Sequence, residues 1–139
     1  MSTIYFLDAV HKTIGLIDVV GRVRVVFQGG EIAMPSGVAL SGDQAMLVAS
    51  DAQGRFSWSF QIGAKGSLEN GEPFYRLEPP EVGWKSGVRS VVEDSIGQVY
   101  FATPMGVQMC EANGRMSAVL NPPEHGGVSS VVFAGKKMN

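Results

Sequence analysis

A phrase that occurs three times along the chain constrains its fold most strongly. At residues 35–51 the sequence PSGVALSGDQAMLVASD gives a short apolar run, a turn of Ser, Gly, Asp and Gln, and a second apolar run. Turn-forming residues between two β-prone apolar runs predict a hairpin. The phrase returns as VRSVVEDSIGQVYFAT at residues 88–103, and its first strand returns as VSSVVF at residues 128–133. We expect each copy to open one repeated structural unit.

The spacing of the copies is typical of propeller blades. Aligned without gaps, the three copies place Ser36, Arg89 and Ser130 in register. Each unit contains four expected strands, and repeats of roughly 40 to 50 residues with four strands indicate a β-propeller. No stretch of about ten residues keeps apolar side chains at helical spacing, so the expected fold class is all-β. A β-sandwich or a small barrel is the alternative for such a series of strands.

The count of expected strands leaves one blade incomplete. One blade spans residues 36–77, another spans 89–120, and residues 3–27 supply only three strands. The strand at 128–133 matches the innermost strand that the blade at 3–27 lacks, so residues 1–139 form one circularly permuted half-propeller domain. Known propellers close with about four to eight blades, so three cannot close a ring.

We therefore expect a homodimer with two-fold symmetry and six blades. In this dimer, strand 128–133 of one chain pairs with strand 3–8 of the other. A piece of a longer chain is the alternative that would also leave one strand without its partner.

Composition excludes several classes of protein. A net charge of −2 gives no basic surface for nucleic acid, and 45% hydrophobic residues indicate a folded domain. No apolar run approaches the length of about 18 residues that spans a membrane, and no signal-peptide pattern precedes the first strand. The single cysteine, Cys110, excludes an internal disulfide framework. We expect a cytoplasmic protein with neither nucleic acid nor membrane as a partner.

Several local patterns predict burial. Residues 3–7 are a continuous apolar run, expected as a strand buried on both faces. Phe56, Trp58 and Phe60 alternate with polar residues and are expected to pack between blades. Cys110 is expected to be buried, and His11, on a short turn, is expected to face solvent. Residues 63–71 are expected to form a polar turn.

The repeated phrases resemble motifs of the senescence-marker-protein/gluconolactonase family, which includes luciferin-regenerating-like proteins. PSGVALSGDQAMLVASD is similar to that family's PNG-x-x-x-S-x-D-x-x-x-L-Y-V-x-D, and VRSVVEDSIGQVYFAT is similar to its PDG-x-x-x-D-x-x-G-x-L-Y-V-A-T. VSSVVFAGKK resembles the family's T-N-x-x-F-G-G strand. The resemblance covers nearly the whole chain against the C-terminal half of a usual member. It implies a six-bladed propeller, and for the family's lactonases one divalent metal, such as calcium or zinc, at the mouth of the central tunnel.

The resemblance also implies which positions would hold that metal. The family's Asn ligand corresponds to Ser36 and its Asp ligand to Arg89, while its Glu ligand belongs to a first blade that has no counterpart here. Hard divalent cations prefer carboxylate and carbonyl oxygens, and a permanently charged guanidinium repels them. We therefore expect no metal, no other cofactor, and no metal-dependent lactonase mechanism.

Four residues around the same positions are candidates for binding a ligand. Arg89 would bind an anion through its fork of donors, or it would pair with a neighbouring carboxylate, Asp51 or Glu81. Ser36 and Ser130 would hydrogen-bond a small polar molecule, or they would only line the tunnel. Asp51 completes this set as a polar residue at the end of its strand.

Two loop residues are further candidates. Trp84 would stack over the tunnel as a lid, or it would cap the edge of a blade. His125 is the candidate general base, with a solvated loop histidine as the alternative.

Three functions follow from these residues. The first is a gluconolactonase-like half-propeller that dimerises and binds a small polar or anionic molecule at the tunnel mouth. The second is a lactonase or esterase-type hydrolase whose site is shared between two chains, and the third is a protein-interaction scaffold. Whether the chain is an enzyme stays open at this point.

Overall fold

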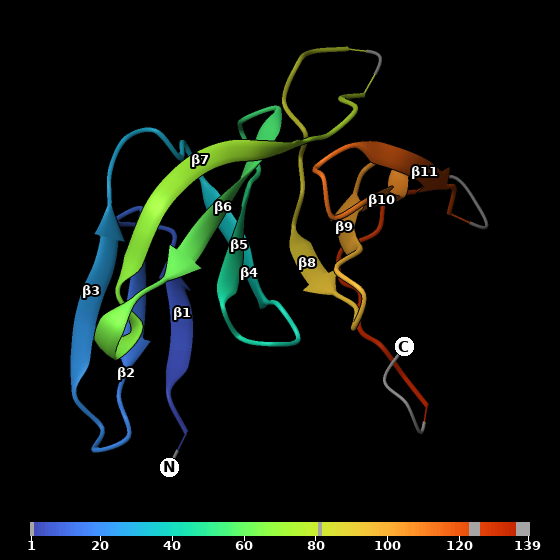
Figure 1. Cartoon of the computed structure of the whole chain (residues 1–139). Helices are drawn as coiled ribbons and strands as arrows, with labels where there is room; N and C mark the ends of the chain where they lie inside the picture. Colours follow the sequence, from blue (N-terminus) through green and yellow to red (C-terminus); the bar gives the residue numbers. More distant parts are fainter. Residues whose placement is uncertain (1, 81, 123–125, 136–139) are drawn as a thin grey trace.

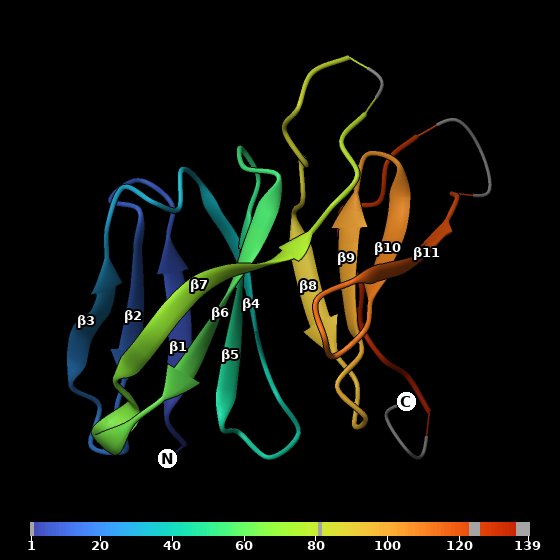
Figure 2. The same ribbon diagram turned by 45° about the horizontal axis from the view of Figure 1, so that its top comes forward.

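Three antiparallel sheets stand side by side in the computed structural model, which describes residues 2–80, 82–122 and 126–135 (Figure 1; Figure 2). The first sheet has three strands, β1 (Ile4–Asp8), β2 (Thr13–Ile17) and β3 (Val23–Gln28), paired in chain order. Among the described residues, β1 pairs within this sheet with β2 and its other edge is unpaired.

The other two sheets each have four strands in chain order. The second contains β4 (Pro35–Leu40), β5 (Met46–Asp51), β6 (Phe56–Ile62) and β7 (Leu68–Arg76). The third contains β8 (Ser90–Glu93), β9 (Val99–Thr103), β10 (Gly106–Cys110) and β11 (Met116–Leu120). β4 lies against both β1 and β8, so the three sheets pack face to face as consecutive blades. The predicted all-β half-propeller is confirmed.

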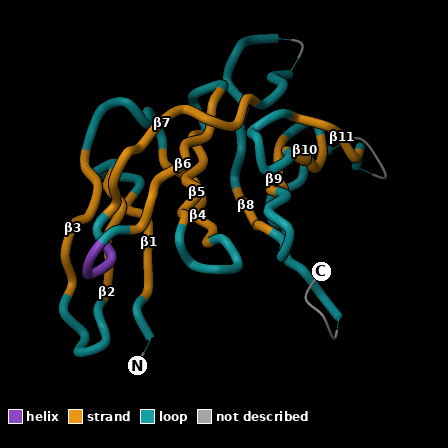
Figure 3. Tube along the Cα trace, in the orientation of Figure 1, coloured by secondary structure: helices purple, strands orange, loops and turns teal. Residues whose placement is uncertain are grey.

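The polar turn predicted at residues 63–71 is shorter than expected. A single 3-10 turn, Ala64–Gly66, is followed at Leu68 by β7, which runs nine residues (Figure 3). Asn70 adopts a left-handed φ of 50°, and two register shifts between β6 and β7 absorb the irregularity. The polar residues therefore belong to an irregular outer strand, because asparagine tolerates this conformation.

Two apolar clusters fill the spaces between consecutive blades. Leu47 and Ala49 of β5 pack with Phe60 toward the first blade, whereas Val48, between them in sequence, packs with Tyr75 toward the third. Successive side chains of a strand point to opposite faces of its sheet, so a middle blade is buried on both faces. This arrangement accounts for the continuous apolar runs in the repeated phrase.

The predicted burial of β6 is wrong for one of its three aromatic residues. Trp58 and Phe60 contribute to the cluster between the first and second blades, but Phe56 is 41% exposed. Phe56 starts the strand at the end of the sheet, opposite Arg76, outside both apolar clusters. Cys110, by contrast, is buried as predicted.

The two ends of the row of blades are incomplete. β1 was predicted to be buried on both faces, yet Ile4 is 48% exposed and the rest of the strand is only half-buried. At the other end, residues 128–133 run beside β8 without joining a strand ladder within the part of the chain that the structure describes. Burial on both faces fails at β1 because, in the part of the chain that the structure describes, no further blade covers the outer face of this strand.

Among the described residues, no helix is long and apolar enough to cross a membrane.

Candidate functional site at the mouth end

The loops that lead into the innermost strands gather at the end of the molecule opposite the N-terminus, which we call the mouth end (Figure 1). In their described parts, these loops lead from β3 to β4, from β7 to β8, and into the segment at 128–133. The turns β1–β2, β5–β6 and β9–β10 lie at the same end. In a propeller, side chains on such loops surround the opening of the central tunnel.

Arg89 lies at this end, immediately before β8. Its backbone N–H donates to the carbonyl oxygen of Ala102 at 2.9 Å, which fixes the backbone at the edge of the third blade. The Arg89 side chain is exposed and lines a cavity of about 200 Å³ together with Pro104, Gly127, Val128 and Ser129. A guanidinium in such a cavity offers a planar fork of donors to an anion.

No carboxylate neutralises Arg89 within the described ranges. The ion pairs found there join His11 to Asp8 and Arg55 to Glu78, so the predicted alternative in which Arg89 pairs with Asp51 is wrong. The other predicted partner, Glu81, lies outside the described residues.

Asp51 has a different role, because its carboxylate faces the backbone. The side chain is 3% exposed, and its two oxygens accept hydrogen bonds of 2.9 Å, 2.9 Å and 3.0 Å from the backbone N–H groups of Ala33, Met34 and Gln53. Both oxygens are therefore engaged in holding the loop that leads into β4. The bond from Gln53 is local, whereas those from Ala33 and Met34 tie the end of β5 to the loop before β4.

Ser36 is half-buried at the start of β4. Its hydroxyl lies 2.8 Å from the Oγ of Ser50, and the Ser50 hydroxyl also donates to the carbonyl of Gly37 at 3.4 Å. The Ser36 hydroxyl is thus already part of a hydroxyl pair between neighbouring strands.

The segment at 128–133 lies one residue out of the register that its sequence suggested. Phe133 packs on Tyr100 of the third blade, with ring centroids 5.3 Å apart. In the same way Glu93 faces the second blade, where it shares a cavity with Tyr75. Phe133 and Glu93 both face the preceding blade, so we align these two residues. Ser129, four residues before Phe133, then corresponds to Arg89, four residues before Glu93, in place of Ser130. Ser129 is also the serine that lines the cavity beside Arg89.

The two loop candidates do not join this cavity. Trp84 is 64% exposed on the β7–β8 loop and is absent from the cavity lining. His125 lies outside the described residues.

The residues at the mouth end do not form the usual donor set of a hard divalent cation. Across residues 2–80, 82–122 and 126–135, no three His, Cys, Asp or Glu side chains come together to hold a metal ion. Ser36 offers a hydroxyl engaged with another hydroxyl, and Arg89 offers a cation. Carboxylate and carbonyl oxygens are what calcium requires, and these two positions supply neither as side chains.

Sequence reasoning missed a buried glutamine that holds the β7–β8 loop. Gln108, fully buried in β10, accepts a hydrogen bond from the Glu78 N–H at 2.7 Å and donates one to the Glu78 carbonyl at 2.8 Å. Its Nε2 also lies 3.3 Å from the Oγ1 of Thr103. A glutamine inside the apolar strand GVQMC was the available signal, since a buried polar side chain needs partners.

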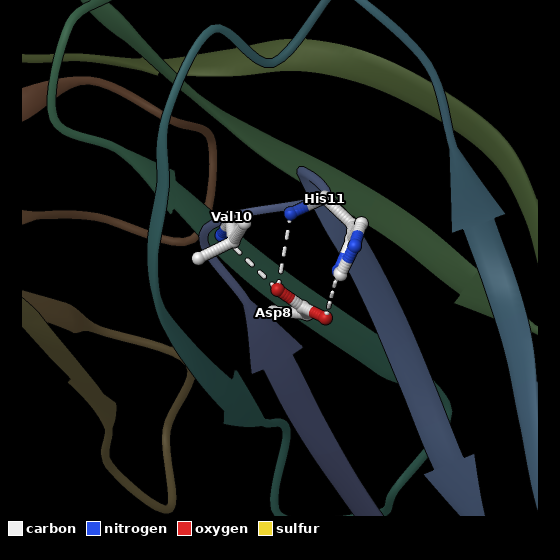
Figure 4. A network of polar contacts seen from close by, with 3 residues as sticks. All are labelled: Asp8, Val10 and His11. Atoms are coloured by element: carbon white, nitrogen blue, oxygen red, sulfur yellow. Dashed lines mark hydrogen bonds and ion pairs between the residues drawn. The ribbon is translucent and has the colours of Figure 1, made fainter.

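A His–Asp pair at the mouth end was also missed (Figure 4). Asp8 accepts 3.0 Å bonds from the N–H groups of Val10 and His11, and its second oxygen lies 2.6 Å from the His11 Nδ1. The backbone and ring bonds from His11 hold the pKa of Asp8 below its usual value. The ring of His11 is 72% exposed, which confirms the prediction that it faces solvent.

Comparisons with known proteins found one matching family model and several solved structures of similar fold. The model of the SMP-30/Gluconolactonase/LRE-like region matches residues 2–139. Among solved structures, a luciferin-regenerating enzyme is 20% identical with a TM-score of 0.73, over 88% of this chain and 40% of the enzyme. A gluconolactonase from Xanthomonas campestris is 19% identical with a TM-score of 0.73, over 91% and 39%. Virginiamycin B lyase from Staphylococcus aureus is 16% identical with a TM-score of 0.70, over 98% and 43%.

At these identities the solved structures establish the fold alone. The chain spans about two fifths of the length of each of the three. No curated protein matches the chain.

Proposed function

The chain belongs to the SMP-30/gluconolactonase/LRE-like family, and we propose that within it this half-propeller binds a small anionic or polar molecule at its mouth without using a metal. The observation that carries the proposal is Arg89, an exposed guanidinium in a cavity of about 200 Å³ with no carboxylate partner in the described part of the chain. A carboxylate or phosphate oxygen would satisfy that guanidinium through charge-assisted hydrogen bonds.

The surrounding groups suit a small polar ligand. Ser129 lines the same cavity, and Pro104 and Gly127 form its wall. Gly127 packs closely on Pro104, because a Cβ added to Gly127 would lie 2.9 Å from the Pro104 Cα. A hydroxylated carboxylate, such as a sugar acid, combines the charge that Arg89 requires with hydroxyls that a serine can bond.

The charge at the former ligand position supports a function without a metal. A guanidinium carries a permanent positive charge, so the Arg89 side chain would repel a divalent cation at that position. The Ser36 hydroxyl is engaged with Ser50, which leaves the mouth without an anionic side chain at either position.

Titration calorimetry with D-gluconate at low ionic strength tests this proposal, with inorganic phosphate as a second probe. We expect both probes to bind in the presence of a chelator. Arg89→Met should weaken binding by about 10- to 150-fold, which corresponds to the 1.5–3 kcal/mol of a hydrogen bond to a charged group. Arg115→Met is the matched control, because Arg115 is exposed on a turn at the opposite end of the third blade.

The competing function is a lactone hydrolase, which family membership favours. Hydrolysis of glucono-δ-lactone is measured with chelator, with added calcium and with added zinc. Turnover that a metal stimulates and that Arg89→Met leaves unchanged would overturn the proposal. Equal binding of gluconate by the wild type and by Arg89→Met would overturn it as well.

A further inference from the structure

We infer that a second copy of this chain supplies the innermost strand that the first blade lacks, in a defined register. Residues 128–133 of one copy pair with β1 of the other so that Phe133 lies opposite Ile4, Val132 opposite Tyr5, and Val131 opposite Phe6. The segment begins beside the ligand cavity, which Val128 and Ser129 line, but the paired residues Val131, Val132 and Phe133 do not line it, so the pairing does not depend on ligand binding.

β1 occupies the second position of its blade, as β9 does in the third blade. Ile4 pairs with Ile17, and Val99 pairs with Cys110. The residue after Ile17 and the residue after Cys110 each begin a turn of the same kind. In the first blade the Asp18 N–H donates to the Arg22 carbonyl at 3.0 Å, and in the third the Glu111 N–H donates to the Arg115 carbonyl at 2.8 Å. Ile4 in β1 therefore corresponds to Val99 in β9. The free edge of β1 corresponds to the edge of β9 that pairs with the innermost strand β8.

The segment at 128–133 already lies where an innermost strand belongs. The Val131 N–H lies 3.4 Å from the Ser90 Oγ, and Phe133 packs on Tyr100. β8 contacts the second blade in the same way, with Val91 in the apolar cluster that contains Tyr75. Val131 and Phe133 thus face the preceding blade as Val91 and Glu93 do, while no second strand of a blade pairs with this segment within the described residues.

Two observed hairpins set the register. The innermost and second strands of the third blade pair as Val91–Phe101, Val92–Tyr100 and Glu93–Val99. Those of the second blade pair identically as Val38–Ala49, Ala39–Val48 and Leu40–Leu47. Carried to the incomplete blade, the same register gives Val131–Phe6, Val132–Tyr5 and Phe133–Ile4.

Every pair in this register is apolar, and its two members face the same neighbouring blade. Tyr5 packs toward the second blade of its own chain, so Ile4 and Phe6 face the open side. A slip of one residue would turn each side chain of 128–133 to the wrong face.

A groove beside β1 fits the incoming strand. A cavity of about 260 Å³ lies between the edge of β1 and β4, lined by Ile4, Tyr5, Val38 and Leu40 among others. Val38 of β4 faces the first blade, just as Val91 of β8 faces the second blade. Val132, which is 82% exposed in one copy, is the side chain that would fill the groove of the other copy.

The outer face of the first blade is apolar over three strands. Ile4 pairs with Ile17, Ile17 pairs with Val23, and Gly15 pairs with Val25, so these residues share one face. Ile4, Val23 and Val25 are 48%, 65% and 58% exposed. Contiguous exposed apolar side chains on a sheet face with an open edge mark an association surface.

The surface that would meet this face is the outer face of the third blade. Tyr100 and Met109 pair across β9 and β10 and share the face on which Phe133 packs. Each copy carries both surfaces, so two copies related by a two-fold axis bury both and close a ring.

Light scattering is the first test. We expect a mass of about 29.6 kDa, twice the 14.8 kDa of one chain. Val132→Asp should return the protein to the monomer mass, because it places a charge in the groove beside β1. Val82→Asp is the matched control, since Val82 is 93% exposed on the β7–β8 loop and should leave the mass at about 29.6 kDa. A monomer mass for the wild type at micromolar concentration, or equal effects of the two variants, would overturn the inference.

Cysteine cross-linking tests the register separately. Ile4→Cys with Phe133→Cys should form a reducible dimer band, because directly opposite Cβ atoms lie about 4.5–5.5 Å apart. Ile4→Cys with Val132→Cys is the control, with one cysteine on the other face. The native Cys110 is buried and stays out of the reaction. Cross-linking of the control pair alone would refute this register. Neither measurement reads ligand binding, so gluconate that fails to bind would leave both results unaffected.

Discussion

Replacing Gln108 by leucine should destabilise the protein through the β7–β8 loop. The side chain bonds both backbone groups of Glu78, at 2.7 Å and 2.8 Å, from a fully buried position. Leucine keeps a similar volume, so packing changes little while both bonds are lost. At a net 0.5–1.5 kcal/mol for each hydrogen bond, the loss of unfolding free energy is about 1–3 kcal/mol. A domain has only about 5–15 kcal/mol in total, so this is a substantial fraction.

Urea unfolding followed by tryptophan fluorescence measures this loss at one fixed protein concentration, because association would shift the midpoint. We expect a lower midpoint with an unchanged slope, since the surface exposed on unfolding stays the same. Gln28→Leu, on the exposed end of β3, should stay within about 0.5 kcal/mol of the wild type. The reasoning is refuted if Gln108→Leu also stays within that limit. A loss no larger than that of Gln28→Leu would refute it as well.

Three further predictions follow from buried groups. Burial, followed by the charges of Asp43 and Asp94, raises the pKa of Glu93, and its Oε2 has no hydrogen-bond partner. The folded state therefore binds the proton more tightly, and the wild type loses stability as pH rises above the usual range of a glutamate. Glu93→Gln should be more stable than the wild type at pH 7, and this gain should shrink toward zero as pH falls below about 4.5 in parallel unfolding curves. Burial raises the pKa of Cys110 to about 12, so a thiol reagent at pH 8 should react only as fast as the protein unfolds; immediate labelling in native buffer would contradict this. Gly106 has a φ of 119°, and an added Cβ would meet the Leu120 carbonyl oxygen, so Gly106→Ala should lower the melting temperature by several degrees in calorimetry; an unchanged melting temperature would show that the β10–β11 edge adapts freely.

Most of the fold could be predicted because its signals are local. The turns at 41–45 and 94–98 are each flanked by apolar runs. Each turn also contains an aspartate whose side chain accepts a hydrogen bond from nearby backbone. Asp43 accepts from the Ala45 N–H, and Asp94 accepts from the Ile96 and Gln98 N–H groups. These bonds join residues two to four positions apart, so residue type alone indicates them.

The candidate site could be predicted only in part. The position of Arg89 at the mouth end follows from its place before an innermost strand, which the repeated phrase shows. The engagement of Asp51 does not follow, because its partners Ala33 and Met34 lie 18 and 17 residues away on a loop with no regular pattern. Gln108 likewise bonds a residue 30 positions away. Partners at such separations are chosen by how the blades pack.

The sequence by itself determined the hairpins and their repetition, since turn chemistry and alternation act over a few residues. Only the tertiary structure decided which face of 128–133 meets the third blade. Val131, Val132 and Phe133 are consecutive apolar residues, so a period of two gives no preference for either face. The contact of Phe133 with Tyr100 selects one face, and that choice places Ser129 beside Arg89 and leaves Val132 exposed. Packing between distant strands supplies this information, because it depends on the shapes of both surfaces together.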